Sequence, residues 1–307
     1  MSPSFIDADQ LAHLLPIGDA IDAIEAIFAS QLPETPQRVR VETATGELLL
    51  MPAIGSRYAG IKLVTVAPGN ASRNRPVVQA TYVLLDGESL TPVSVIDGTE
   101  LTALRTAAVS GLATRHLANP GARTLVIFGA GTQANAHLVA MAAVREIGSV
   151  RVVSRSLIPA QELAARAGDL GMDAAVAGPE VVAEADIVCT CTTSAQPVLD
   201  GSLLRAGAHV NAVGAYRPDQ RELDDETVRR GRIVVETRES ALAEAGDLLI
   251  PMGNGVIGSK SILADLAEVV RGKRVRRDPG DVTVFKSVGV AFEDLAVAAA
   301  VYERSAV

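Results

Sequence analysis

Gly129, Gly131 and Ala134 stand at the spacing G-x-G-x-x-A, directly after a four-residue apolar run at 125–128. The first glycine permits a tight turn, the second lets the backbone approach a pyrophosphate, and the small third residue lets a helix pack closely on a strand. A helix expected at 133–144 would turn its positive N-terminal end toward that pyrophosphate. The stretch predicts a dinucleotide site, with contacts from Gly129, Gly131, Thr132, Gln133 and Ala134.

Ser154, Arg155 and Ser156 stand at the end of the next predicted strand, at 150–154, where the residue types indicate which nicotinamide cofactor binds. An acidic residue here would accept hydrogen bonds from the ribose hydroxyls of NAD. One cation between two hydroxyls instead suits a 2′-phosphate, because no carboxylate repels it. We therefore predict NADP(H), contacted by all three residues, with NAD(H) as the alternative. If Arg155 is an ordinary solvated charge, it carries no such preference.

Three basic residues lie in or beside segments that are predicted to be buried. Lys62 lies inside an apolar strand predicted at 60–66, Arg105 inside an alanine-rich helix, and Arg38 at the start of a predicted hairpin. A buried cation has to be paired with an anion, whereas an exposed one needs no partner. The pattern alone leaves both options open.

The elements around these residues predict two kinds of sheet. After two helices that end near residue 32, short strands separated by turns favour a largely antiparallel sheet, with strands at 38–42, 47–51, 60–66, 77–85 and 91–96. A helix at 99–117, capped at Thr99, leads into strands that alternate with helices, which is typical of a doubly wound parallel sheet. Ligands bind at the carboxyl ends of such strands, which places Thr192, Val213 and Gly214 near the nicotinamide. The predicted fold class is α/β, a Rossmann-type sheet plus an α+β domain.

Composition narrows the function classes. The 307 residues are 48% hydrophobic and 21% charged, with a formal net charge of −8. No basic stretch occurs beyond 271–277, so we expect no nucleic-acid partner. No apolar run is long enough to span a bilayer and no signal-like segment occurs, so we expect no membrane association and a cytoplasmic location. The four histidines lack metal-ligand spacing, and Cys189 and Cys191, on alternate positions of one predicted strand, indicate packed thiols; we predict no metal.

The chain resembles the ornithine cyclodeaminase/μ-crystallin family over nearly its whole length. The matching segments lie at 51–53, 62–65, 68–70, 97–98, 104–108, 129–134, 211–214, 217–219, 222–224, 245–247 and 284–289. The resemblance implies an NADP-binding Rossmann domain at 119–289 and a substrate-binding and dimerisation domain at 1–118 and 290–307. It also implies a C-terminal helix at about 291–303 and a homodimer.

The same resemblance assigns the three unexplained cations. It implies that Arg38, Lys62 and Arg105 converge on the carboxylate of an α-amino or α-imino acid, with Lys62 and Arg105 as the catalytic pair. Because hairpin length varies, Arg40 is the alternative to Arg38. The matching segments further assign Thr106, Lys286 and Ser287 to the cofactor.

Tyr216 separates branches of the family. Cyclodeaminases and the related archaeal alanine dehydrogenases look to have an aspartate two residues after the position of Gly214, whereas this chain has Tyr216 and then Arg-Pro-Asp, which resembles the μ-crystallin branch. A tyrosine is a poor general base near neutral pH. The resemblance therefore implies an NADPH-dependent imine reductase with Tyr216 at the substrate.

Cyclic ketimines are the expected substrates, Δ1-pyrroline-2-carboxylate or Δ1-piperideine-2-carboxylate, giving proline or pipecolate; acyclic imino acids are the alternative. Lys62, Tyr216 or a water could supply a proton. Two other functions stay open: an ornithine cyclodeaminase using NAD or an alanine-type dehydrogenase, and a non-catalytic small-ligand binding protein.

Overall fold

The computed structural model describes residues 3–73 and 75–305. The chain forms two compact units, Met1–Arg105 with Val290–Val307 (unit 1) and Thr106–Gly289 (unit 2). The units divide inside helix α3 (Gly98–Leu117), between Arg105 and Thr106. The assignment of substrate to one unit and cofactor to the other stays a prediction. Among the described residues, none of the helices combines the length and the apolarity that crossing a bilayer requires.

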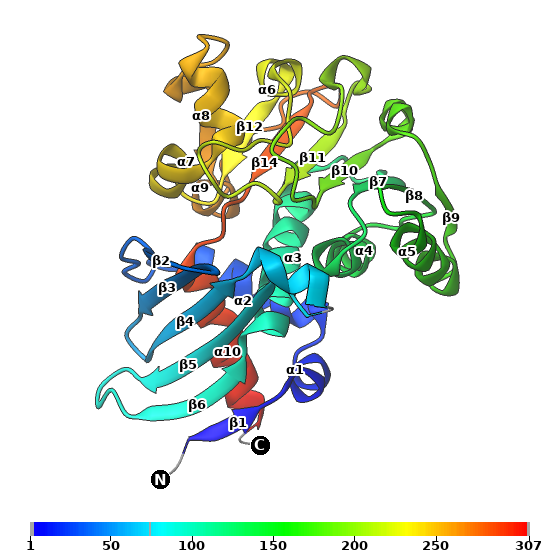
Figure 1. The fold of residues 1–307 in the computed structure, drawn as a ribbon. Coiled ribbons are helices and arrows are strands. Elements are labelled where there is room, and N and C mark those ends of the chain that lie inside the picture. Colours follow the sequence, from blue (N-terminus) through cyan, green and yellow to red (C-terminus); the bar gives the residue numbers. More distant parts are fainter. Residues whose placement is uncertain (1–2, 74, 306–307) are drawn as a thin grey trace. The chain divides into compact units, whose positions relative to one another are not determined.

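Unit 1 contains a six-stranded sheet in the order β1-β6-β5-β4-β3-β2 (Figure 1). Its strands are β1 (Ser4–Ile6), β2 (Val39–Thr43), β3 (Gly46–Ile54), β4 (Tyr58–Val66), β5 (Val78–Asp86) and β6 (Pro92–Asp97). All neighbours are antiparallel except β1 and β6, which are parallel. The prediction of a largely antiparallel sheet is confirmed, and the short strand β1 was not predicted.

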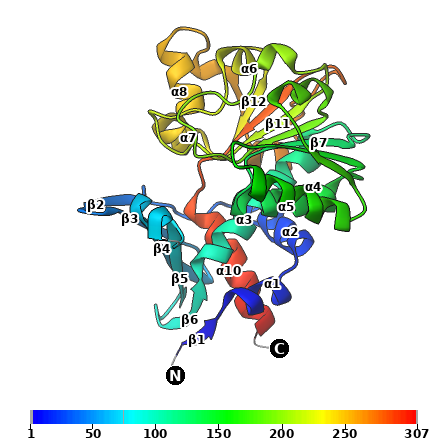
Figure 2. The same cartoon turned by 45° about the vertical axis from the view of Figure 1, so that its right-hand side comes forward.

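Helix α10 (Ala291–Ser305) packs on β3, β4 and β5 and against α2 (Ile17–Ala29), as Figure 2 shows. Phe292 of α10 meets Phe28 of α2 edge to face, with ring centroids 5.1 Å apart. Helix α1 (Ala8–Leu14) lies beside α10 and β6, and the 3-10 helix η1 (Pro68–Arg73) follows β4. The C-terminal helix thus lies over the middle of a sheet built from the first hundred residues.

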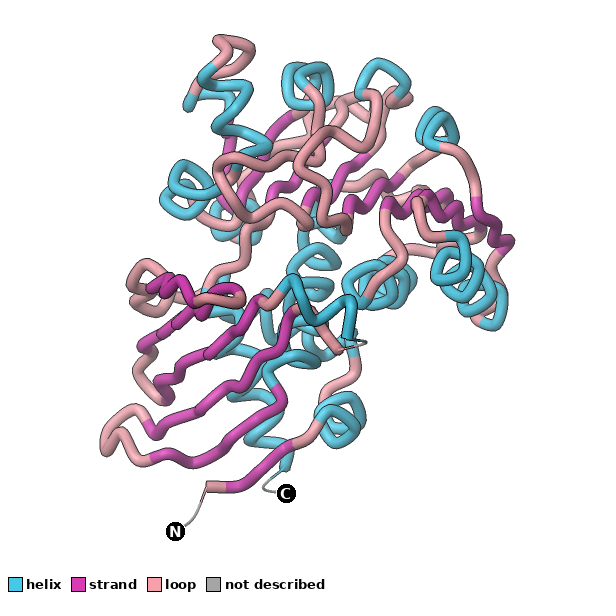
Figure 3. The backbone as a smooth tube through the Cα atoms, viewed as in Figure 1, coloured by secondary structure: helices cyan, strands magenta, loops and turns pink. Residues whose placement is uncertain are grey.

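Unit 2 contains an eight-stranded, fully parallel sheet in the order β13-β12-β14-β11-β10-β7-β8-β9. Its strands, which are four or five residues long, are β7 (Thr124–Phe128), β8 (Ser149–Val153), β9 (Asp173–Val176), β10 (Ile187–Thr190), β11 (His209–Ala212), β12 (Arg232–Val235), β13 (Ile262–Asp265) and β14 (Thr283–Lys286). Figure 3 shows strands in magenta and the helices between them in cyan. The run β9-β8-β7-β10-β11 is the 3-2-1-4-5 order of doubly wound sheets, in which ligands bind where the order reverses. Here that reversal lies between β7 and β10, and the predicted fold class is confirmed.

The helices of unit 2 cover this sheet. They are α4 (Thr132–Val144), α5 (Leu157–Asp169), α6 (Asp225–Arg230), α7 (Arg238–Glu244), α8 (Gly246–Gly253) and α9 (Leu266–Val270), with 3-10 turns η2 (Pro179–Glu184), η3 (Gly201–Leu203) and η4 (Ser259–Ser261). Val126, Val188 and Val210 of the central strands share one hydrophobic core with Val228 of α6 and Leu248 of α8. This burial holds the carboxyl ends of the strands in place.

Two local predictions are wrong. The N-terminal amides of α3 are capped by Asp97, whose carboxylate accepts from the N–H groups of Thr99 and Glu100, whereas the Thr99 hydroxyl accepts from Ala80 N–H. Strand β10 ends at Thr190, so Cys191 lies just beyond it. Asp97, rather than Thr99, therefore caps α3, because aspartate is at least as good an N-cap residue as threonine.

Candidate functional site

The turn after β7 has the geometry that the glycine spacing predicts. Gly129 has φ +106°, and a Cβ there would lie 2.5 Å from the Cys191 carbonyl oxygen. Only glycine fits this backbone and this close approach. Its N–H donates to the Val153 carbonyl at the end of β8, which ties the turn to the neighbouring strand.

The start of α4 is open to a ligand. Gly131 is the N-cap of α4, makes no side-chain cap, and would meet no atom within 4 Å if it carried a Cβ. The first N–H groups of a helix have no partner within the helix, and a bound anion can satisfy them. Ala134 is fully buried, as close packing of helix on strand requires. An uncapped helix start beside open space fits a dinucleotide pyrophosphate.

Ser154, Arg155 and Ser156 form the turn after β8. The Ser154 hydroxyl accepts a 3.2 Å hydrogen bond from Ser156 N–H, and Ser156 is the N-cap of α5. Arg155 is exposed and makes no ion pair within residues 3–73 and 75–305. Its charge is therefore available to an anion at this edge of the sheet.

A single buried carboxylate joins the loops after β10 and β11. One oxygen of Glu222 accepts from the N–H (2.7 Å) and hydroxyl (2.8 Å) of Thr192, and the other accepts from Gly214 N–H (2.7 Å) and the Thr190 hydroxyl (2.8 Å). A Cβ on Gly214 would lie 2.1 Å from the Thr192 carbonyl oxygen. Thr192 and Gly214 are thus held together, next to Val213. The sequence analysis missed Glu222.

Lys286 and Asp247 lie beside Glu222. The Lys286 ammonium is 2.9 Å from Asp247 Oδ2 and donates to the Ala212 and Ala215 carbonyls. Asp247 Oδ1 in turn accepts from the N–H groups of Glu222 and Leu223. Burial raises the pKa of Glu222, the Asp247 carboxylate raises it further, and Lys286 opposes both.

Ser287 is engaged in the same way, because its hydroxyl donates to Glu236 at 2.6 Å. The polar groups of Lys286 and Ser287 therefore serve the protein's own backbone and carboxylates. Their assignment to the cofactor stays a prediction.

In unit 1, Lys62 and Arg105 meet at one carboxylate. Lys62 Nζ lies 2.8 Å and Arg105 Nε 3.0 Å from Asp294 Oδ1, while Arg105 Nη1 lies 3.0 Å from Glu293 Oε2. Lys62 is 1% exposed and both acids are 0% exposed. The strand alternation of β4 turns Gly60, Lys62 and Val64 toward the same buried face. The cations are thus buried and paired.

Hydrogen-bonding capacity is left over in this cluster. Lys62 donates only one hydrogen bond to the described residues, to Asp294, although an ammonium has three donors. Tyr82, opposite Lys62 in the β4–β5 register, has a buried hydroxyl with no partner among residues 3–73 and 75–305, and the same holds for Asp294 Oδ2. Gly60 makes room for this ring, since a Cβ there would lie 2.3 Å from the Tyr82 hydroxyl oxygen. Buried polar atoms normally have partners, so a polar ligand suits this cluster.

Charge and burial tune Lys62. Burial lowers its pKa to about 8, the positive charges of Arg105 and Arg38 lower it as well, and Asp294 opposes the shift. Arg38 therefore lies close enough to act on Lys62, whereas Arg40 pairs with Glu47 at 2.8 Å. These contacts favour Arg38 over Arg40 for a role at this site.

The remaining predicted residues lie in unit 2. Thr106 is buried on α3, and Tyr216 is half-buried against the hydrophobic core of the parallel sheet. Their contacts with a ligand stay predictions. Cys189 is buried and Cys191 half-buried, both as free thiols, and burial raises the pKa of Cys189 to about 12. In the described part of the chain, no three His, Cys, Asp or Glu side chains are grouped as a metal site.

Glu293 and Asp294 are the functional candidates that sequence reasoning missed in unit 1. The signal was present, because two adjacent acids interrupt the apolar sequence at 290–298 just as Lys62 interrupts an apolar strand. Acidic residues within apolar segments, like cations there, are expected to be buried and paired, and this rule points to Glu293 and Asp294.

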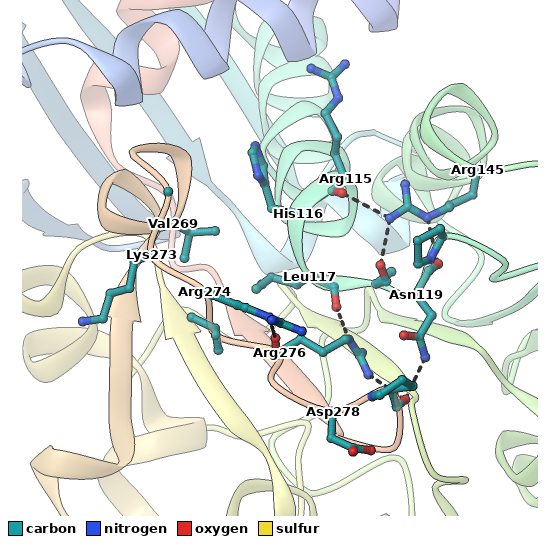
Figure 4. Close-up of a pocket in the computed structure, with 15 residues that line it drawn as sticks. Arg115, His116, Leu117, Asn119, Arg145, Val269, Lys273, Arg274, Arg276 and Asp278 are labelled. Carbon is teal, nitrogen blue, oxygen red and sulfur yellow. Dashed lines mark hydrogen bonds between the residues drawn. The ribbon is translucent and has the colours of Figure 1, made fainter.

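A basic cavity of about 470 Å³ lies elsewhere in unit 2, at the C-terminal end of α3, and contains none of the predicted residues (Figure 4). Arg145 donates to the carbonyls of Thr114, Arg115 and Ala118, and Arg276 to those of Leu117 and Ala208. These guanidinium groups satisfy the last carbonyls of α3 and offset its dipole. Two of the basic side chains that line the cavity thus have a structural role as caps of α3.

Comparison with known proteins identifies the family of the chain. The model of the ornithine cyclodeaminase/mu-crystallin family matches residues 3–306. The chain belongs to this family. It is 38% identical to the ketimine reductase mu-crystallin of Rattus norvegicus, over 98% of this chain and 97% of the relative.

Two solved structures share the fold across the chain. One is the Δ1-pyrroline-2-carboxylate reductase of Thermococcus litoralis in complex with NADH and L-proline, with a TM-score of 0.94 at 34% identity, covering 99% of this chain and 97% of that one. The other is an archaeal alanine dehydrogenase dimer with bound NAD, with a TM-score of 0.95 at 33% identity, covering 100% and 97%.

Proposed function

We propose that the chain is an NADPH-dependent imine reductase that converts cyclic α-imino acids, Δ1-pyrroline-2-carboxylate or Δ1-piperideine-2-carboxylate, to proline or pipecolate. The observation that carries the proposal is the buried Lys62 ammonium, which donates one hydrogen bond to the described residues and retains two donors. A carboxylate is the acceptor that such a cation favours. Likeness to the reductases from rat and Thermococcus supports the reaction class.

Each residue has a role in the proposed reaction. Lys62 and Arg105, with Arg38, bind the substrate carboxylate and so orient the adjacent C=N bond. The bound nicotinamide would supply the hydride to the imine carbon. A protonated imine is already electrophilic and requires no strong acid, and its N–H would find an acceptor in Asp294 Oδ2. The leftover donors and acceptors of the cluster match the two ends of an α-imino acid.

The cofactor assignment follows from unit 2. We infer that the uncapped start of α4 binds the pyrophosphate and that Arg155 binds the 2′-phosphate of NADPH, with NADH as the alternative. Because Arg155 is exposed, its ion pair is worth about 1 kcal/mol, or roughly fivefold. Arg155→Ala should weaken NADPH binding by this factor in a fluorescence titration and leave NADH binding unchanged. Equal weakening of both cofactors would contradict the assignment.

An alanine-type dehydrogenase is the second candidate, favoured by the TM-score of 0.95 to the archaeal enzyme. Tyr216 argues against this candidate and against ornithine cyclodeamination. By the family resemblance, both the alanine dehydrogenases and the cyclodeaminases have an aspartate at this position. The intact cluster at Lys62 and the intact glycine turn speak against a purely non-catalytic binding role. We further infer a cytoplasmic homodimer, with likeness to the alanine dehydrogenase dimer as support for the dimer.

NADPH consumption with each ketimine tests the proposal, run beside pyruvate with ammonia and beside ornithine with NAD. We expect ketimine reduction, lost by about a thousandfold in Lys62→Met and retained in Lys260→Met, which changes an exposed lysine. Ammonia release from ornithine would overturn the proposal in favour of a cyclodeaminase. Turnover of pyruvate with ammonia, but of neither ketimine, would overturn it in favour of an alanine-type dehydrogenase. No turnover at all would favour a binding protein.

A further inference from the structure

Asp294 occupies a central position in the buried cluster of unit 1. Its Oδ1 oxygen lies between Lys62 Nζ at 2.8 Å and Arg105 Nε at 3.0 Å. The two cations come from β4 and α3 and would repel each other at this separation without an anion between them. One oxygen atom therefore holds both cationic groups close to itself and so close to each other.

Helix α10 holds this oxygen in place. Glu293 and Asp294 lie in the first turn of α10, where the helix dipole stabilises carboxylates. Glu293 binds Arg105 Nη1 at 3.0 Å, so two adjacent acids hold two edges of one guanidinium and fix its plane. The Phe28–Phe292 contact anchors the same turn against α2.

We propose that Asp294 is the positioning residue of the substrate site, whose Oδ1 oxygen sets Lys62 and Arg105 at the spacing needed to bind one substrate carboxylate. This inference rests on the proposed imine reductase function. It adds a residue from the far end of the chain, 232 positions after Lys62, to a site otherwise assigned to cations.

The charge of Asp294 and its position have separable consequences. Four titratable groups from different parts of the chain surround Lys62. Asp294 of α10, Arg105 of α3 and Arg38 before β2 shift its pKa, and Tyr82 of β5 lies opposite it in the sheet. Among the charged ones only Asp294 favours the protonated ammonium, because the two arginines oppose it. Removing this charge should lower the pKa of Lys62, whereas moving it should mainly disturb the spacing of the cations.

Two variants of the full-length protein separate these effects. In Asp294→Asn we expect KM for Δ1-pyrroline-2-carboxylate to rise by about tenfold or more, and the alkaline limb of the pH profile of kcat/KM to move to lower pH. In Asp294→Glu we expect the rise in KM with the alkaline limb kept, because the charge stays and the oxygen moves. The dissociation constant of NADPH should be unchanged in both variants. A general loss of structure would instead weaken NADPH binding as well.

Glu303→Gln is the matched control, an acid-to-amide change on the same helix at an exposed ion pair with Arg57. We expect wild-type kinetics from it. If Asp294→Asn does not fold, Asp294→Glu carries the test through KM alone. Wild-type KM and an unmoved alkaline limb in Asp294→Asn, or wild-type KM in Asp294→Glu, would overturn the inference while the reductase stands. An inactive wild-type protein would instead overturn the proposed function itself.

Discussion

Lys62 and Lys286 are the two buried lysines of this molecule's described core, each 1% exposed, each on a strand, and each within 2.9 Å of a buried aspartate. They differ in how many acceptors surround them. Lys286 has Asp247 and two backbone carbonyls, whereas Lys62 has Asp294 alone. A saturated ammonium braces the fold, and an unsaturated one has donors left for a ligand.

The carboxylates near them divide less sharply, because Asp247 Oδ2, although 2.9 Å from the Lys286 ammonium, also accepts no hydrogen bond from the described residues. Both oxygens of Glu222 accept two hydrogen bonds each, whereas Asp294 Oδ2 accepts none from residues 3–73 and 75–305. The Tyr82 hydroxyl is unsatisfied in that same range of the chain. The comparison teaches that the number of acceptors around each buried ammonium, rather than its burial or charge, distinguishes a brace from a candidate binding site in the described part of the chain.

The largest expected effect tests the brace. Lys286→Met should lower the free energy of unfolding by about 3–5 kcal/mol, because it leaves Asp247 buried and uncompensated. Lys62→Met should lower it by less, since Arg105 still pairs with Asp294. Urea unfolding monitored by circular dichroism measures both. Equal losses would break the distinction between the two lysines.

Glu222→Gln should show how far the saturated network supports the cofactor loops. An amide nitrogen cannot accept hydrogen bonds, so two of the four would be lost, at about 2–3 kcal/mol in the free energy of unfolding. NADPH affinity should fall as well, because the loops of Thr192 and Gly214 lose their common anchor. Calorimetric titration checks the affinity, with the exposed Glu239→Gln as control. Unchanged affinity with reduced stability would confine Glu222 to folding.

The pH dependence tests the unsaturated lysine. The pKa of Lys62 is lowered from 10.5 to about 8, so kcat/KM should fall above about pH 8, where the ammonium loses its proton. Stability should respond in the opposite sense: between about pH 8 and 10.5 the unfolded chain binds more protons, so the Lys62 contribution to the free energy of unfolding rises with pH. The pH profile of kcat/KM for the wild-type protein should show this alkaline fall. An activity that stays flat to pH 10 would exclude a protonated Lys62.

Tyr82→Phe should have the smallest effect. The hydroxyl has no partner in the described chain, so its removal should leave the free energy of unfolding within about 0.5 kcal/mol of wild type. If a substrate supplies the missing partner, KM should rise by about three- to tenfold, the value of one hydrogen bond. A clear loss of stability together with an unchanged KM would mean that the cluster of unit 1 is not a ligand site.

Local patterns predicted much of the fold. The period-two alternation of β3 to β6 and the glycine turn at 129–134 depend on near neighbours, and the structure has these elements within a few residues of their predicted bounds. The four-residue strands β9, β13 and β14 were not predicted, because so short a segment carries little periodic signal unless its residues form a distinct apolar run. The predicted cap of α3 at Thr99 is wrong because Asp97, two positions earlier, carries the stronger N-cap side chain and accepts from the first N–H groups of the helix.

The sequence by itself determined the family, the dinucleotide turn, the serine–arginine–serine edge and the three cations that needed an explanation. Only the tertiary structure decided that Lys62 and Arg105 share Asp294, that Glu222 joins two loops, and that Lys286 has three acceptors around it. The physical reason is that hydrogen-bond saturation depends on groups far apart in the chain, 232 residues in the case of Lys62 and Asp294. A charge in an apolar segment shows that a partner is needed, but the fold alone supplies it.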